Sequence, residues 1–269
     1  MYNLKRNSTC FLFALVSAAS LLGGCNAASM RDGDLNQVQT FSDRPRAGNV
    51  YLLRGFIGIW STGIDKLGEE INKEGIRATV YRCEQWEELT DTILKKYKDQ
   101  KVYEPLVIIG HSWGADHALD MAHKLETAHI PVDLIVTLDP VTPPTVPANV
   151  KWCHNVFQTN GIWQKIPYFR GVPLEQEKNS PGKLENLNVR TVRTDLLEPD
   201  TNHYNIEKNV KIHKDVLLQL EKVCPRRQEW AMQHPFYKPP VVAEKPKAPV
   251  AVPASAPRQA SSATASLDQ

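Results

Sequence analysis

The feature that most constrains the fold of this chain is the alternation of short apolar runs with longer segments of helical periodicity. Strand-like runs rich in branched side chains occupy residues 50–53, 78–81, 105–109 and 133–138, and further strands are expected near 155–159 and 189–193. Apolar residues at helical spacing cover 64–72, 86–97, 113–126 and 206–220. Repeated strand–helix units joined by short loops predict an α/β fold, with a mostly parallel sheet of about six strands and helices on both faces.

The N-terminus has the pattern of an export signal. A basic pair at residues 5–6 precedes an apolar run over 11–22 that is short for a membrane span, and small residues follow. The ending Leu22-Gly23-Gly24-Cys25 resembles a bacterial lipobox, which implies that Cys25 carries a lipid and begins the mature chain. Because Asn26 follows, and not the Asp of inner-membrane retention, the resemblance implies the periplasmic face of the outer membrane. Ordinary cleavage after residue 27 or 28, which releases a secreted protein, is the alternative.

Composition also sets the domain boundaries. From about residue 238 the chain is rich in Pro, Ala and Ser and poor in large apolar side chains. Such a segment cannot bury enough surface to offset the entropy lost on ordering. We therefore predict a lipoprotein signal peptide over 1–24, a linker over 25–42, a folded domain over 43–237 and a flexible tail over 238–269. The predicted domain is long enough to bury a sizeable core.

Charge and cysteine use exclude several classes of function. The 32 Lys and Arg against 30 Asp and Glu give a formal net charge of +2 with both signs interspersed, so nothing indicates a nucleic-acid partner. Outside the signal and the lipobox the cysteines are Cys83, Cys153 and Cys224, which allow at most one internal disulfide, of open pairing. None of them has metal-ligand spacing. We expect small buried thiols, no metal and no cofactor.

The motif that carries chemistry is G-x-S-x-G at residues 110–114, with the sequence Gly-His-Ser-Trp-Gly. It lies between the apolar run 105–109 and the helical segment 113–126, which is the context of a nucleophile elbow. There the strand turns so tightly into the helix that Gly110 and Gly114 must lack side chains and the serine is held in a strained conformation. The motif predicts that Ser112 is a nucleophile; an ordinary glycine-bounded turn is the alternative.

A serine nucleophile needs a histidine base and an acid that orients the base, in the chain order Ser, acid, His for such an elbow. Asp139 ends the strand that follows the Ser112 helix. It is preferred by exclusion, because no Asp or Glu occurs between residues 141 and 174. His203 stands just before the last helix, where the base is expected. An Asp-Pro turn with no catalytic role is the alternative for Asp139.

The remaining acidic residues and histidines are expected to have other roles. Asp116 and Asp120 lie on the helix after the serine and are predicted to face water. The elbow residue His111 is expected to pack behind the turn. The other histidines, among them His154 and His213, are expected to be solvated or to cap helices.

Acyl transfer also requires hydrogen-bond donors for the developing oxyanion. One donor is expected to be the backbone N–H of Trp113, the residue after the nucleophile. The second is assigned to the backbone N–H of Phe56, because Gly55 before it lets the chain turn close to a substrate. A glycine that merely ends a strand is the alternative.

Taken together, the core over 50–220 resembles the α/β-hydrolase superfamily. The resemblance rests on four segments in that superfamily's order: Arg54-Gly55-Phe56, the elbow at 110–114, Leu138-Asp139-Pro140 and Asn202-His203-Tyr204. The core is also similar to exported bacterial lipase-, esterase- or thioesterase-like lipoproteins. It departs from them in having Arg-Gly where many esterases have His-Gly, and in an acid that directly follows the strand after the nucleophile helix.

The resemblance implies a serine hydrolase that cleaves carboxylic esters through an acyl-enzyme, using Ser112, Asp139 and His203. It implies a small-molecule or lipid ester as substrate and contact with a membrane through the lipid on Cys25. Three alternatives stay open: an amidase or peptidase, an acyltransferase, and a non-catalytic envelope lipoprotein. The aromatic residues of 161–173, together with Trp60, are expected either to form a lid or acyl pocket or to cover the edge of the sheet. Acyl chain length and oligomeric state stay open.

Overall fold

The computed structural model describes residues 42–235, apart from the segments 57–61, 99–102 and 160–170. The predicted lipobox at Cys25, the tail over 238–269 and Trp60 lie outside the described residues. Most of the aromatic insertion, residues 161–170, also lies outside them. The expectations for these segments therefore stay predictions.

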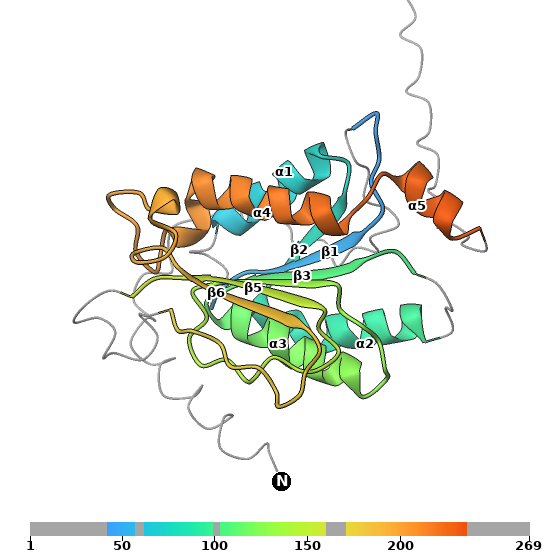
Figure 1. The fold of residues 1–269 in the computed structure, drawn as a ribbon, viewed down its shortest axis with the longest axis horizontal. Helices are drawn as coiled ribbons and strands as arrows, with labels where there is room; N and C mark the ends of the chain where they lie inside the picture. The colour runs from blue at the N-terminus through green and yellow to red at the C-terminus, as the bar shows by residue number, and fades with distance from the viewer. Residues whose placement is uncertain (1–41, 57–61, 99–102, 160–170, 236–269) are drawn as a thin grey trace, which may run out of the picture.

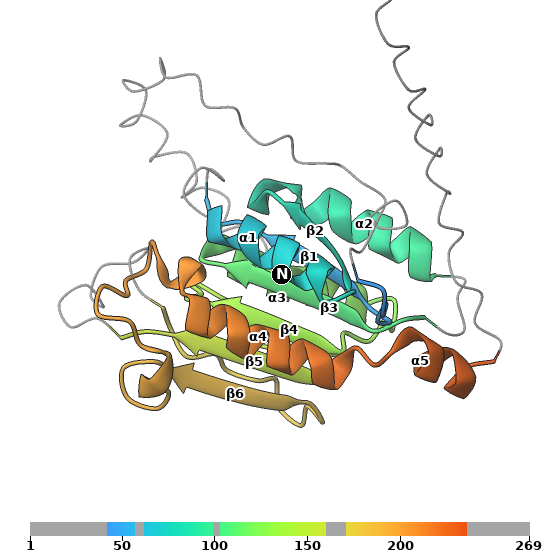
Figure 2. The same ribbon diagram turned by 90° about the horizontal axis from the view of Figure 1, so that it is seen from above.

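The core of the structure is one six-stranded sheet. In chain order its strands are β1 (Asn49–Leu53), β2 (Arg77–Tyr81), β3 (Leu106–His111), β4 (Leu134–Leu138), β5 (Trp152–Phe157) and β6 (Lys183–Asn188). Their order across the sheet is β2-β1-β3-β4-β5-β6, and every neighbouring pair is parallel (Figure 2). The carboxyl ends of all six strands therefore meet at one edge, and the predicted fold class is confirmed.

Helices cover both faces of this sheet. They are α1 (Thr62–Lys73), α2 (Trp86–Tyr97), α3 (Trp113–Glu126), α4 (Val210–Val223) and α5 (Arg227–Gln233), with short 3₁₀ turns η2 (Cys83–Gln85), η4 (Thr194–Leu196) and η5 (Ile206–Lys208). Figure 1 shows α1 and α4 on one face of the sheet and α2 and α3 on the other. Among the described residues, no helix combines the length and the apolar character needed to cross a bilayer.

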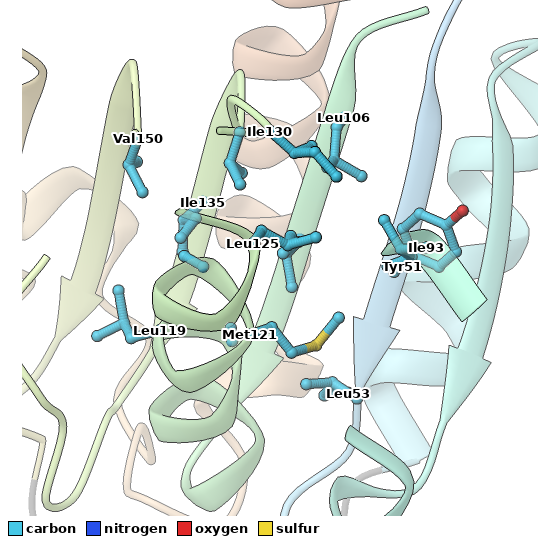
Figure 3. Packing of buried hydrophobic residues seen from close by; sticks show 14 of the residues in the cluster. Tyr51, Leu53, Ile93, Leu106, Leu119, Met121, Leu125, Ile130, Ile135 and Val150 are labelled. Carbon is cyan, nitrogen blue, oxygen red and sulfur yellow. The ribbon is translucent and has the colours of Figure 1, made fainter. Parts of the chain in front are cut away.

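Two apolar cores result from this layering. Tyr51 and Leu53 of β1 point toward α2 and α3, where they meet side chains such as Ile93 and Met121 (Figure 3). The alternate residues of the same strand, Val50 and Leu52, belong to the second core under α1 and α4. Both faces of the central strands are thus buried, which explains why the sequences of these strands are continuous apolar runs.

The last third of the chain corrects two strand predictions. The strand expected near 155–159 begins earlier, at Trp152, and the segment 189–193 is a turn that follows β6. β6 occupies 183–188, whose sequence Lys-Leu-Glu-Asn-Leu-Asn has only two apolar residues. An edge strand pairs on one side only and is partly exposed, so its pairing with β5 forms without the apolar signal of the inner strands.

The predicted helix over 206–220 is divided by Asn209. This residue caps α4, because its side-chain oxygen accepts hydrogen bonds from the backbone N–H groups of Lys211 and Ile212. The residues before it form η5 instead of a continuous helix. Helix α5, which sequence periodicity did not predict, is seven residues long and contributes a single buried side chain, Trp230.

The three cysteines behave as predicted. Cys83, Cys153 and Cys224 are buried free thiols, so the described residues contain no disulfide. Burial raises the pKa of all three, that of Cys224 to about 12. Their role is therefore one of packing.

A cluster of buried charged side chains lies at the edge of the sheet formed by the amino ends of the strands. Glu104, which is fully buried, accepts hydrogen bonds from the backbone N–H of Gly48 at 2.8 Å and from Nη2 of Arg77 at 2.6 Å. Its other oxygen lies 3.3 Å from Nη1 of Arg227, at the start of α5. One carboxylate thus connects the approach to β1, the start of β2 and the C-terminal helix.

Replacing Glu104 by Gln should destabilise the fold strongly. The substitution leaves the buried guanidinium of Arg77 without its counter-charge, a loss that typically costs about 3–5 kcal/mol. Urea denaturation measures the free energy of unfolding. A matched control is Asp195→Asn, because the Arg193–Asp195 pair is exposed and its removal should change stability little. Equal effects of the two substitutions would contradict a structural role for Glu104.

Candidate active site

Ser112 lies at the turn between β3 and α3, with φ 55° and ψ −123°. A positive φ is rare for a residue with a side chain, and strained backbone of this kind persists only where the surroundings impose it. Here the backbone N–H of Ser112 donates to the carbonyl oxygen of Leu138 at 2.9 Å, while α3 begins at the next residue. The structure therefore has the predicted elbow.

The two glycines of the motif are explained by close backbone contacts. A Cβ on Gly110 would lie 2.2 Å from the carbonyl oxygen of Gly114, and a Cβ on Gly114 would lie 2.4 Å from that of Arg54. Both distances are far below van der Waals contact. Strand β1, strand β3 and helix α3 can approach this closely only because neither residue has a side chain.

The structure brings Ser112, His203 and Asp139 into one hydrogen-bonded chain. Ser112 Oγ lies 3.0 Å from His203 Nε2, and His203 Nδ1 lies 3.1 Å from Asp139 Oδ2. Asp139 is fully buried, and Ser112 and His203 are 8% and 5% exposed. Three residues that are 27 and 64 positions apart along the chain are thus in contact at the carboxyl edge of the sheet.

The surroundings of Asp139 fix its carboxylate in place. Asp139 also has a positive φ, 50°, and its Oδ1 accepts a hydrogen bond from the backbone N–H of Gln158 at 2.8 Å. A Cβ on Gly171 would lie 2.0 Å from the same oxygen, so only glycine fits there. Sequence reasoning missed Gln158 and Gly171, because their contact with Asp139 is set by the path of the chain after β5.

The loop that carries His203 is held by two further side chains. His111 Nε2 donates to the backbone carbonyl of His203 at 2.9 Å, which places the elbow residue behind the base as expected. Burial lowers the pKa of His111 to about 3, so its ring is neutral. Arg190 donates through Nη2 to the carbonyl of Thr201 at 2.6 Å and through Nε to Gln158 Oε1 at 3.0 Å. The turn after β6 thus connects the base loop to the acid.

Asp116 corrects a sequence prediction, because it is buried and does not face water. Its carboxylate accepts hydrogen bonds from the backbone N–H of Val141 at 2.9 Å and from the backbone N–H and hydroxyl of Thr142, at 2.8 and 3.0 Å. Both partners lie directly after Asp139-Pro140. Asp116 therefore holds the acid loop against α3, a pairing that helical periodicity cannot reveal.

Two other histidines are also buried, contrary to prediction. His154 lies within β5, with Nε2 at 2.8 Å from Asp215 Oδ2 and Nδ1 at 3.2 Å from Glu185 Oε2. His213 lies on α4 between the Glu70 carboxylate and the carbonyl of Glu207. Both rings connect α4 to its neighbours, and neither contacts Ser112 in the described structure.

The proposed oxyanion residues are adjacent in space. The rings of Phe56 and Trp113 lie 4.5 Å apart between centroids, although 57 positions separate the two residues. Phe56 lies in the turn that follows β1, and Trp113 is the first residue of α3. Phe56 is 39% exposed, so its ring forms part of the surface next to Trp113.

A group with metal-ligand chemistry lies away from this site. Ligand atoms of His123, Glu126 and Glu177 are all within 4.8 Å of one another. His123 is eleven positions after Ser112, about 16 Å along α3 at 1.5 Å per residue. No metal chemistry at Ser112 follows from this group.

The all-parallel sheet, the strained elbow and the hydrogen-bonded Ser112–His203–Asp139 chain define an α/β-hydrolase fold. No protein-family model matches the chain, and no curated protein matches it. Solved structures similar to it include Est1E from Butyrivibrio proteoclasticus, with 12% identity, TM-score 0.41 and coverage of 67% of this chain and 90% of that one.

Two other similar structures are described as an α/β serine hydrolase without a lid, from Xanthomonas campestris, and the type II thioesterase BorB from the borrelidin biosynthetic cluster. The first has 12% identity, TM-score 0.41 and coverage of 70% and 87% of the two chains. The second has 12% identity, TM-score 0.39 and coverage of 70% and 99%. Likeness at this level says nothing about activity.

Replacing Asp116 by Asn should destabilise the acid loop. An amide offers one acceptor oxygen and turns its NH₂ group toward a backbone donor, so a buried N–H of Val141 or Thr142 loses its partner at a cost of about 1–3 kcal/mol. Thermal and urea denaturation measure the effect. Asp120→Asn is the matched control on the same helix, because its half-buried pair with His117 contributes at most about 1 kcal/mol. If Asp116→Asn were no more destabilising than the control, the assigned role would be wrong.

Proposed function

We propose that this protein is a serine hydrolase that cleaves carboxylic esters through an acyl-enzyme. The observation that carries the proposal is the continuous contact from Ser112 Oγ through His203 to Asp139 Oδ2, at 3.0 and 3.1 Å. A serine hydroxyl is a weak nucleophile at neutral pH unless a base takes its proton. Here such a base lies within hydrogen-bonding distance and is itself oriented by a buried acid.

The role of Asp139 follows from its position. Its Oδ2 faces His203 Nδ1, so the histidine tautomer with the proton on Nδ1 is favoured and the lone pair on Nε2 points at Ser112. The second oxygen, Oδ1, accepts a hydrogen bond from the backbone N–H of Gln158, which prevents the carboxylate from rotating away. Asp139 also stabilises the imidazolium that forms when His203 takes the proton.

The proposed reaction has two steps. His203 accepts the Ser112 proton, Ser112 Oγ attacks the ester carbonyl, and the backbone N–H groups of Phe56 and Trp113 donate to the oxyanion. His203 then gives the proton to the departing alcohol. In the second step His203 deprotonates a water molecule, which attacks the acyl carbon. The bond to Ser112 Oγ then breaks, the acid is released, and His203 returns the proton to Ser112 Oγ.

The surface near Ser112 favours an acyl group with apolar character. Phe56 packs on Trp113, the residue after the nucleophile, and Tyr204, which is 50% exposed, packs against His203 at 5.7 Å between ring centroids. Exposed aromatic rings that contact neighbours of the nucleophile offer apolar contact to a small-molecule or lipid ester. Thioesters share the same carbonyl chemistry and belong to the proposed range.

The alternatives carried by the sequence are separated by product and rate measurements. Turnover of p-nitrophenyl esters without turnover of matched anilides favours an esterase over an amidase or peptidase. Products formed with added alcohols identify an acyltransferase. A chain that neither turns over esters nor reacts with a serine-directed probe would be a non-catalytic envelope protein.

The location of the protein is part of the proposal and rests on sequence alone. We propose export to the cell envelope, with a lipid on Cys25 that attaches the protein to the periplasmic face of the outer membrane. Cys25→Ala should abolish lipid labelling and globomycin-sensitive processing. Unchanged membrane association of that variant would contradict the anchor.

Replacing Ser112 by Ala should abolish labelling by a fluorophosphonate probe and reduce ester hydrolysis by at least about 10³-fold, since the nucleophile is removed. The fold should remain, because only a hydroxyl is lost; circular dichroism and the unfolding temperature check this. Ser180→Ala, at a half-buried serine in the loop before β6, serves as a labelling control. Undiminished probe labelling of the Ser112→Ala variant would refute the assignment.

A further inference from the structure

Glu207 is a buried carboxyl group that the proposed chemistry does not use. It follows His203 by four positions, lies in η5 and has no exposed surface. A Cβ on Gly63 would lie 2.1 Å from Glu207 Oε2 and 2.2 Å from the Glu207 carbonyl oxygen. Both the side chain and the backbone of Glu207 are therefore pressed against the first turn of α1, where only glycine fits.

The position of the carboxylate is electrostatically matched to this helix end. Neither oxygen has a hydrogen-bond partner of full geometry among the described residues, yet the backbone N–H groups of Gly63 and Ile64 lie close enough to lower its pKa. The N-terminus of a helix carries partial positive charge and attracts an anion. Burial acts in the opposite direction and is stronger, so the pKa of Glu207 is raised to about 7.

Charged and titratable groups from η5, α1 and α4 surround Glu207. Lys208 Nζ, on η5, lies 4.0 Å from Oε1 and lowers the pKa, while Asp65 on α1 raises it. From α4, His213 Nε2 donates to the Glu207 carbonyl at 2.7 Å, and its Nδ1 lies 2.8 Å from Glu70 Oε2. Glu207 is therefore one member of a buried polar network that connects η5, α1 and α4.

The first turn of α1 also contacts a residue close in sequence to the proposed oxyanion residue Phe56. Arg54, two positions before Phe56, donates through Nε to Asp65 Oδ1 at 3.0 Å and contacts the same oxygen through Nη2. Contacts thus run from Arg54 to Asp65, along α1 to Gly63, and on to Glu207 and the base loop. This path joins the two loops that must be aligned for acyl transfer.

We propose that Glu207 is a positioning residue that aligns the loop of His203 with the oxyanion turn through the first turn of α1, and that the alignment is tight when its carboxyl group is ionised. The inference rests on the proposed function of Ser112 and His203. The ionised carboxylate attracts the first-turn amides of α1, and the neutral acid attracts them less.

The sign of the pH dependence follows from the direction of the shift. A carboxyl group whose pKa is raised in the folded protein binds protons more tightly there than in the unfolded chain, so its ionisation lowers stability as pH rises from about 4.5 toward 7. Over the same range its charged form tightens the alignment. Stability should therefore fall while activity rises, a combination that a merely structural side chain does not produce.

The test uses the full chain with Glu207→Gln, which keeps the shape and removes the charge. We expect kcat for a p-nitrophenyl ester to fall about tenfold at pH 8 and less than about twofold at pH 5.5, with KM little changed. The unfolding temperature of the variant at pH 8 should equal or exceed that of the unchanged protein. Glu229→Gln, on the surface of α5, should alter none of these quantities.

Lys208→Met tests the same proposal independently if Glu207→Gln does not fold. Lys208→Met removes the nearest positive charge, so the activity midpoint should move to higher pH. Parallel pH profiles for the unchanged protein and both variants would overturn the proposal, as would an equal loss of stability at both pH values.

Failure of the proposed function is distinguished from failure of this inference by a measurement that needs no turnover. The imidazole resonances of His203, compared by NMR between the unchanged protein and Glu207→Gln, should differ at pH 8 and coincide at pH 5.5. If the chain reacts with neither ester nor probe but shows this difference, the proposed hydrolase function is refuted and the coupling to Glu207 stands. Identical resonance shifts in the variant would refute the coupling, whatever the activity.

Discussion

The close packing of β1, β3 and α3 around the elbow is the constraint on which the rest of the site depends. Backbone atoms of the three elements meet where Gly110 and Gly114 have no side chains, and this contact forces Ser112 into a positive-φ conformation. Strain of this kind needs support from many neighbouring contacts. The layers of apolar side chains on both faces of the sheet supply that support, so the geometry of the nucleophile depends on the whole fold.

Much of the architecture could be predicted because its signals are local. The predicted helices 86–97 and 113–126 coincide with α2 and α3, because the amphipathic spacing of a helix can be recognised within one short segment of sequence. The inner strands were predictable for the same reason, as both of their faces are buried. β6 was misplaced because an edge strand needs few apolar residues, and its position is decided by pairing with β5.

In the site, too, residues with a local sequence signal are predictable and residues that act through distant contacts are not. The elbow motif, the lack of Asp or Glu over 141–174 and the order along the chain predict Ser112, Asp139 and His203, and the structure brings these three residues together. Asp116, Arg190 and Gly171 were not assigned to the site, because each acts on a residue far away in sequence. A buried polar side chain looks like an exposed one until its partner is known, and partners are fixed only by the folded chain.

The charge cluster at Glu104 determines how the domain can be held. Through Arg227 and Gly48 it draws both ends of the described chain to the amino edge of the sheet, where a bridge between Arg46 and Arg226 lies as well. Ser112 is at the opposite edge, beyond the carboxyl ends of the strands. Both ends of the described domain therefore lie at the edge of the sheet opposite Ser112, so neither end stands beside the nucleophile.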